Sequence, residues 1–330
     1  MKINNINSLA VQQARIKALS HARLSSYRRF YATQSDQETL GLYQWNEDLS
    51  AMFFKLIISI EIVLRNQCHA AMSTRYGAIG SGSSRDWYEH IQLTTLSRQK
   101  IQEITHIKRR TQWTPRNPFP TPDDVISRLT FGFWPHLLDV GHDSNNYPIA
   151  WGNILLDVLP GHRQRQAIYW ARQKHRDALF GRLDLCNEMR NRIAHHEPIW
   201  KMGSLLEETR ARAGSLPAVI APPPVTPSDA LDRLKLIYER LNELLDWLSP
   251  EIAADYTQSE MHHKCLSLLS LHIINAYRHA QQPTALNLAH YQNNRTLKKA
   301  IRLASRQRQP IVLKDGHRTL GYITCVANTP

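Results

Sequence analysis

The feature that most limits how this chain can fold is the near absence of strand-like alternation before residue 300. Apolar residues recur instead at spacings of three and four, which places them on one face of a helix. Glycine, which would interrupt helices, accounts for only 13 of the 330 residues. The pattern predicts an all-α fold, with one long helix or two over Asp36–Tyr76 and the longest single helix over His162–His195.

Shorter helices are expected on either side of these two. Capping signals such as Thr121-Pro122-Asp123-Asp124 and Ser228-Asp229 mark where helices begin. The expected helices cover Asn7–Phe30, Thr95–Arg110, a segment beginning at the Thr121 cap, a segment from Ser228-Asp229 to Leu248, Ser259–Ala280 and Asn294–Arg308.

The end of the chain has a different pattern. Residues Ile311–Val326 alternate around Asp315-Gly316, a dipeptide that favours a two-residue hairpin turn. Ser249-Pro250 marks the expected domain boundary. We therefore expect a helical domain over residues 1–250 and a small basic appendix over 251–330, made of a helix and a β-hairpin.

Charge restricts the class of partner. Lys and Arg number 41 against 28 Asp and Glu, a formal net charge of +13, which favours a polyanion over an acidic small substrate. The cysteines lack C-x-x-C spacing, so the sequence offers no zinc ribbon, and we expect no metal and no small-molecule cofactor. The sequence suggests no signal peptide or membrane span, and a cytoplasmic location is expected. The four cysteines are Cys68, Cys186, Cys265 and Cys325.

The most informative segment is CNEMRNRIAHHEPIW, at the end of the helix predicted over His162–His195. Arg190 falls on the apolar stripe of that helix, between Cys186 and Ile193, where an arginine is costly unless it is paired. Asn191 and His195 are one turn apart on the adjacent face. An arginine can bind a phosphate and a histidine can move a proton, so this cluster suits phosphodiester chemistry.

A structural role is the alternative. Arg-x4-His occurs a second time in this chain, from Arg85 to His90, so the spacing alone carries little weight. The helix end, the adjacent asparagine and the flanking His196 distinguish the first copy. The residues alone leave open whether Arg190, Asn191 and His195 are catalytic or form a satisfied structural cluster.

RNRIAHHEPIW resembles the RNxxxH signature of HEPN domains, and specifically that of the Abi (abortive infection) family of bacterial phage-defence proteins. Further segments are similar to that family in the same order, over roughly residues 40 to 205. They are IEIVLRNQC (Ile60–Cys68), RYG with DWY (Arg75–Gly77 and Asp86–Tyr88) and RLTFGFWPHLL (Arg128–Leu138).

The resemblance implies a HEPN-type helical bundle and a metal-independent endoribonuclease whose site is built from two HEPN units. Because this chain shows one such unit, a homodimer is expected. Arg190 would bind the scissile phosphate, Asn191 would orient or hydrogen-bond, and His195 would act as acid or base. The 2′-hydroxyl of RNA would attack, leaving a 2′,3′-cyclic phosphate and a 5′-hydroxyl. Some HEPN domains are instead non-catalytic RNA binders.

Three residues of the earlier helix are candidate supporting residues. Glu61 and Arg65 are spaced for a salt bridge along a helix. Either this pair holds the helix, or Glu61 neutralises and orients Arg190, while Arg65 and Asn66 could contact RNA. His196 is a further supporting candidate beside His195.

The last 40 residues are strongly basic, with eight Lys or Arg and one acid, Asp315. The charge favours a phosphate-tracking surface. The candidate RNA-binding residues are Arg295, Lys298, Lys299, Arg302 and Arg306.

The sequence thus predicts a ribonuclease toxin of an anti-phage system, restrained by an antitoxin or a guide-like RNA. The alternatives are a non-catalytic RNA-binding protein of the same fold and a protein-interaction module.

Overall fold

The structure of the protein is a computed structural model that describes residues 9–279, 284–291, 293–306 and 311–323. Most of these residues are helical, and the strands are short. The predicted all-α character of the chain is therefore confirmed. The ends expected at Asn7, Arg308 and Val326 lie outside the described residues.

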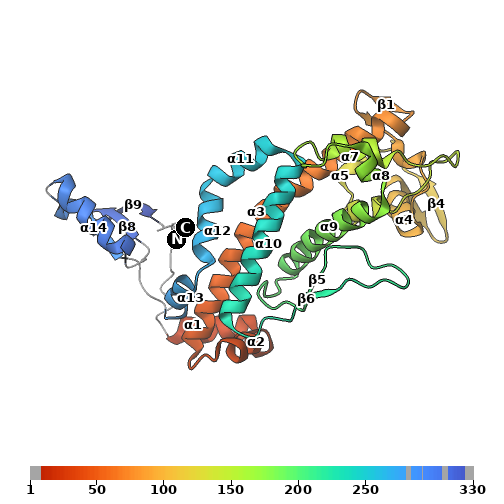
Figure 1. Cartoon of the computed structure of the whole chain (residues 1–330). Helices are drawn as coiled ribbons and strands as arrows, with labels where there is room; N and C mark the ends of the chain where they lie inside the picture. The colour runs from red at the N-terminus through yellow and green to blue at the C-terminus, as the bar shows by residue number, and fades with distance from the viewer. Residues whose placement is uncertain (1–8, 280–283, 292, 307–310, 324–330) are drawn as a thin grey trace.

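One long helix, α3 (Asp36–Tyr76), organises the body. Its N-cap Ser35 accepts a hydrogen bond from the Glu38 N–H, and the apolar residues Leu49, Phe53 and Leu56 are fully buried along it. Helices α10 (Pro227–Leu248), α9 (Gln173–Ala194) and α13 (Leu271–Arg278) pack on it (Figure 1). The sequence allowed one helix or two over this segment, and the structure has one.

The remaining elements of the body are short. They are α1 (Leu9–Leu19), α2 (His21–Tyr31), β1 (Gly80–Ser81), β2 (Ser84–Arg85), η1 (Trp87–Glu89), α4 (Thr95–Thr105), β3 (His106–Arg109), β4 (Gln112–Pro115), α5 (Pro122–Ser127), α6 (Phe133–Leu137), α7 (Trp151–Val158), α8 (Ala167–Ala171), β5 (Leu205–Leu206), β6 (Val219–Ala221), α11 (Pro250–Gln258) and α12 (Glu260–Leu268).

Three predicted helices are wrong in extent, because each is divided into two helices in the structure. At each break a polar side chain caps the start of the second helix or the end of the first. Ser20 separates α1 from α2 and Ser270 separates α12 from α13, and each accepts a hydrogen bond from the N–H three residues later. The predicted helix His162–His195 is divided before Gln173. There the Arg176 guanidinium binds the carbonyls of Trp170 and Ala171, at 3.0 and 2.6 Å, and so satisfies the end of α8.

Two other predicted boundaries move. The helix expected over Thr95–Arg110 ends at Thr105, and His106–Arg109 forms β3, which pairs antiparallel with β4. The helix predicted from Ser228-Asp229 begins two residues earlier, because Thr226 and Asp229 form a reciprocal capping box around Pro227.

The helical body extends beyond the boundary expected at Pro250. Tyr256, Leu268 and Ile274 belong to the same buried cluster as the residues of α3. Gly41 of α3 approaches α13 so closely that an added Cβ would lie 2.0 Å from the Tyr277 carbonyl oxygen. The appendix with its own core therefore begins after Arg278, not at residue 251.

That appendix contains β7 (Thr284–Asn287), η2 (Leu288–His290), α14 (Asn294–Arg306), β8 (Ile311–Asp315) and β9 (Arg318–Ile323). The predicted helix and hairpin are present. The sequence did not predict β7, which pairs parallel with β8 and completes a sheet of order β7-β8-β9. Leu286 and Ile311 form its small core. In Figure 1 this module stands apart from the helical body.

A buried histidine fixes the β1–β2 hairpin and should make stability depend on pH. His69 Nδ1 accepts a hydrogen bond from Trp87 Nε1 at 2.9 Å, and Nε2 lies 3.0 Å from Ser84 Oγ. Burial lowers the pKa of His69. The neutral ring therefore stabilises the fold at and above neutral pH, and this stabilisation is lost as the pH falls below about 6.5 through the lower folded-state pKa.

We expect His69→Gln, which keeps an acceptor and a donor but does not titrate, to weaken the pH dependence of stability. The change in the free energy of unfolding between pH 7.5 and 5.5 should be smaller than in the unmodified chain by up to about 1.4 kcal/mol per pH unit crossed. Urea unfolding at several pH values measures it. Identical pH profiles for the two proteins would contradict the assignment.

Candidate functional site

The C-terminal end of α9 carries the three candidate catalytic residues. Arg190 and Asn191 are half-buried, and His195, the residue that ends the helix, is exposed. Cys186, one turn before Arg190, is fully buried against α3. Arg190 is thus at the edge of the core, as its place on the apolar stripe predicted.

Arg190 keeps most of its hydrogen-bonding capacity unused. Its Nε is buried without a hydrogen-bond partner, and its Nη1 makes a long contact of 3.4 Å with Asn191 Oδ1. Among the described residues, no carboxylate lies within ion-pairing distance of this guanidinium. A half-buried arginine with free donors is costly for stability, and it is suited to bind an anion from outside the chain.

The expected salt bridges of Glu61 do not form. Glu61 and Arg65 are half-buried on α3 and Asn66 is exposed, and neither Glu61–Arg65 nor Glu61–Arg190 is an ion pair within the described residues. Burial raises the pKa of the Cys186 thiol, and the charge of Glu61 raises it further. Glu61 therefore lies at the interface with α9. Its carboxylate is therefore near the site without neutralising Arg190.

The turn after α9 is fixed by two residues from distant helices. Arg23 of α2 donates to the His196 carbonyl at 2.6 Å, and Asn46 of α3, itself buried, accepts from the Ile199 N–H at 3.0 Å. His196 adopts a left-handed backbone conformation with φ of 54°. Sequence reasoning missed Arg23 and Asn46, since nothing in their local sequence indicates a partner more than 150 residues away.

A carboxylate also lies near this turn. Burial raises the pKa of Glu47 on α3, while Tyr43, Arg15 and His196 act to lower it. Burial raises the pKa of Tyr43, and the charge of Arg23 acts to lower it. Cations from α1 and α2 and acids from α3, Glu47 and Asp48, therefore lie in the neighbourhood of this turn.

The aromatic residues near the motif serve packing. Trp200 is 2% exposed and stacks on Phe30 with ring centroids 4.5 Å apart, and Trp134 and Phe131 are each 1% exposed. The second Arg-x4-His pair does not form a cluster: Arg85 lies in β2, and His90 contacts Asp86 at 3.3 Å.

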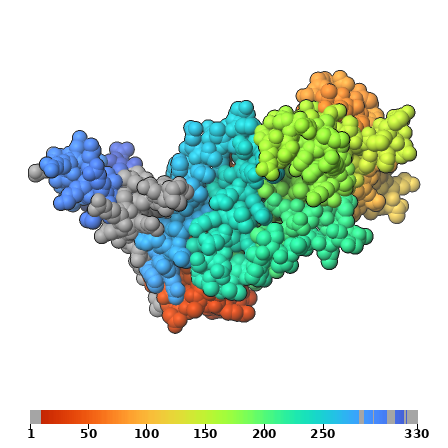
Figure 2. Space-filling model, in the orientation of Figure 1, coloured from red at the N-terminus to blue at the C-terminus, as the bar shows by residue number. Residues whose placement is uncertain are grey.

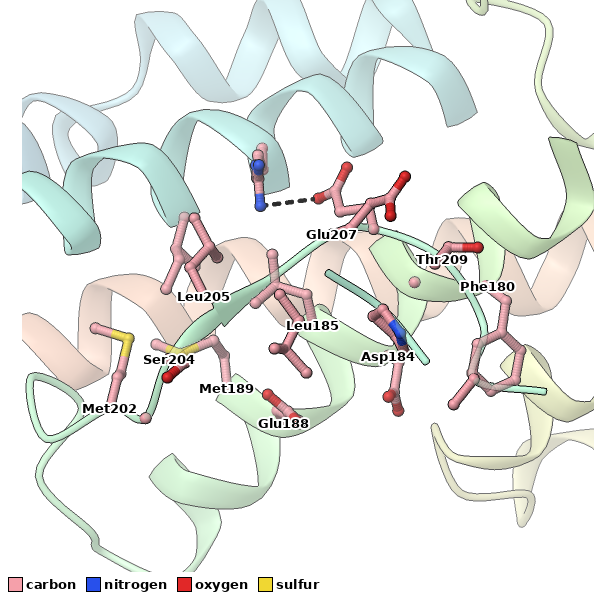
Figure 3. Close-up of a pocket in the computed structure, with 18 of the residues that line it drawn as sticks. Phe180, Asp184, Leu185, Glu188, Met189, Met202, Ser204, Leu205, Glu207 and Thr209 are labelled. Atoms are coloured by element: carbon pink, nitrogen blue, oxygen red, sulfur yellow. Dashed lines mark ion pairs between the residues drawn. The ribbon is translucent and has the colours of Figure 1, made fainter. Parts of the chain in front are cut away.

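A cavity of about 660 Å³ lies on another face of α9, under the segment that contains β5 (Figure 3). Asp184 and Glu188 line it from α9 and Glu207 from the covering segment, and no ion pair within the described residues involves any of the three. Burial raises the pKa of Asp184 and of Glu188, and Asp184 raises that of Glu188 further. Arg192, Arg210, Arg233 and Arg240 line the same cavity, so acidic and basic side chains face each other across it.

The basic residues of the appendix lie together on α14. Arg295, Lys298, Lys299 and Arg302 are exposed, line one surface hollow with Asn294 and Leu303, and form no ion pair within the described residues. Arg306 ends the helix, and its side chain lies outside the described part of the chain. The module that carries α14 protrudes from the helical body (Figure 2), and α14 is well separated from α9 (Figure 1).

The described residues contain no group of three His, Cys, Asp or Glu side chains placed to hold a metal ion. Within the same ranges, no helix is both long enough and apolar enough to cross a membrane.

The comparisons with known proteins give one match. The model of one protein family, described as Abi-like protein, matches residues 14–201, which is more than half of the chain and includes α2, α3 and the whole of α9. No curated protein and no solved structure matches.

Proposed function

Because this chain belongs to the family of Abi-like proteins, which suggests a role in abortive infection, we propose that it is a HEPN-type endoribonuclease toxin of an anti-phage system. In this proposal it acts in the cytoplasm, needs no metal, and cleaves RNA by attack of the 2′-hydroxyl to give 2′,3′-cyclic phosphate ends. The single observation that carries the proposal is the free guanidinium of Arg190 one turn before the exposed His195.

In this proposal each residue of the motif has a role. The guanidinium of Arg190, with donors that no carboxylate occupies, binds the scissile phosphate and stabilises its developing charge. The amide of Asn191, already in contact with Arg190, orients that guanidinium. The imidazole of His195 is open to solvent and transfers the proton, and His196 holds the turn through its backbone.

A second copy of the chain completes the site. One face of α3 lies beside Glu61 and the interface with α9. On this face Phe54 is 37% exposed, Ile62 is 44% exposed, and Ile58 between them is half-buried. These residues are one helical turn apart, and Arg65 and Asn66 follow them. An apolar ridge next to a lone Arg190 motif supports a homodimer in which two motifs face one RNA.

The basic face of α14 is the proposed contact for a second stretch of RNA, either substrate or an antitoxin or guide-like RNA. Four exposed cations without acidic partners are suited to track phosphates. A toxin requires restraint, and a separate basic module can hold a restraining RNA without occupying the motif.

An induced-expression growth assay tests the proposal. We expect the unmodified chain to arrest bacterial growth and to produce new RNA fragments with 5′-hydroxyl ends, and Arg190→Ala and His195→Ala to do neither at equal protein levels. Equal growth arrest by all three proteins would favour the second candidate, a non-catalytic RNA-binding protein. RNA sequencing of 5′-hydroxyl ends separates cleavage from mere sequestration.

A further inference from the structure

The β3–β4 hairpin is an exposed basic element far from the motif. Residues 104–122 contain no Asp or Glu. Lys108, Arg109 and Arg110 at its tip are exposed, and no ion pair within the described residues involves them. Arg110 has φ of +56°, a left-handed conformation that costs a side chain other than glycine about 1 kcal/mol. The hairpin therefore places three unneutralised cations on one turn.

Aromatic rings share one face of this hairpin with a cation. In the β3–β4 register Lys108 pairs with Trp113 and His106 with Pro115, so these four side chains point to the same side. Lys108 Nζ lies 5.7 Å from the Trp113 ring centroid. The His106 ring meets the edge of Phe119, which is 55% exposed, with centroids 6.4 Å apart.

The hairpin contributes no buried residue to the core. Every residue from His106 to Pro120 is exposed or half-buried. The base alone is fixed to α4, where Arg116 donates from Nε to the Ile104 carbonyl at 2.8 Å and from its N–H to the Thr105 carbonyl at 3.0 Å. Packing does not account for these rings and charges, because a two-stranded hairpin without a buried face adds little stability.

We infer that the β3–β4 hairpin is a binding site for single-stranded RNA, with unpaired bases stacking on Phe119 and Trp113 and phosphates bound by Lys108, Arg109 and Arg110. Stacking on the exposed ring of Phe119 and the half-buried ring of Trp113 needs unpaired bases. The hairpin itself carries no acid that would repel the RNA backbone, while Asp124 lines the hollow beside Phe119. The choice of RNA rests on the proposed function. The hairpin lies near the end of α9 opposite to His195, so it would contact RNA away from the motif (Figure 1).

Fluorescence anisotropy with a labelled 2′-O-methyl oligouridylate tests this inference without any cleavage. We expect the triple variant Lys108→Ala, Arg109→Ala, Arg110→Gly to bind at least about tenfold more weakly at 0.1 M salt. The plot of log affinity against log salt concentration should also become shallower. The magnitude of its slope should decrease by about 2, since each single-strand phosphate contact contributes about 0.7. Glycine at 110 fits the left-handed turn.

A matched control removes three exposed cations elsewhere, through Lys100→Ala, Arg163→Ala and Lys235→Ala. It should bind within about threefold of the unmodified chain with an unchanged salt slope, because these residues contact no phosphate. Phe119→Ala should weaken binding about fivefold or more without changing the slope, since stacking carries no charge. Thermal unfolding checks that each variant is folded.

Equal affinities and slopes for the hairpin triple and the control triple would overturn the inference, as would equal competition by a double-stranded RNA of the same length. The outcome is independent of catalysis, because the probe cannot be cleaved. If the hairpin triple loses binding while the growth assay shows no cleavage, the hairpin assignment stands and the ribonuclease proposal fails.

Discussion

Replacing His195 by alanine is expected to lower the rate of RNA cleavage by the purified protein by about 10²–10⁴-fold, the usual contribution of a positioned acid–base group. His195 is the exposed residue that ends α9, and its N–H donates to the Asn191 carbonyl at 2.9 Å. The substitution removes the imidazole and leaves this backbone hydrogen bond intact. Single-turnover cleavage of an end-labelled RNA measures the rate.

The same assay separates the roles of the neighbouring residues. Arg190→Ala should lose about 10²–10³-fold, and Arg190→Lys should recover only part of this, because an ammonium group lacks the two-pronged geometry that binds phosphate. His263→Ala, which changes an exposed histidine on α12, is the matched control and should keep the unmodified rate. If His195→Ala cleaves as fast as His263→Ala, His195 is not the proton-transfer group.

The sequence was sufficient to place the motif, because the information is local. Arg190, Asn191 and His195 lie within six residues, and Pro198 ends the helix just beyond them, so periodicity alone placed them at one helix end. The same holds for the hairpin around Asp315-Gly316. Helix ends were predicted less well where serines such as Ser20 and Ser270 cap a new helix inside an apparently continuous pattern.

Contacts between distant segments could not be predicted. Arg23 and Asn46 fix the turn after α9 from α2 and α3, and their own neighbourhoods show only helical periodicity. Strand β3 continues a helical pattern and becomes extended only because β4 pairs with it. The ion pair expected between Glu61 and Arg190 does not form for the same reason. The two residues lie on different helices, so the sequence can suggest that they are near each other but not how their side chains are oriented.

Arg182 of α9 is the residue whose loss should destabilise the fold most. Its side chain is 7% exposed and holds Glu208 through two hydrogen bonds of 2.7 and 2.8 Å and Glu243 through one of 2.8 Å. It also donates to the Arg240 carbonyl and lies over the Trp247 ring. Arg182→Ala should lower the free energy of unfolding by about 3–5 kcal/mol, because the largely buried Glu208 loses both of its short hydrogen bonds and keeps a longer contact of 3.4 Å with Arg240.

Urea unfolding compares this variant with Arg28→Ala, which removes an arginine that pairs with Asp36 at a similar distance, 2.7 Å, but is 32% exposed. The exposed pair should contribute no more than about 1 kcal/mol. The double variant Arg182→Leu, Glu208→Leu should recover part of the loss, since neither member of the Arg182–Glu208 pair then remains, while Arg240 loses its contact with Glu208. Equal effects of Arg182→Ala and Arg28→Ala would mean that the segment around Glu208 is held on α9 by other contacts. The close approach of Gly181, whose added Cβ would lie 2.5 Å from the Thr209 backbone nitrogen, would then be the main candidate.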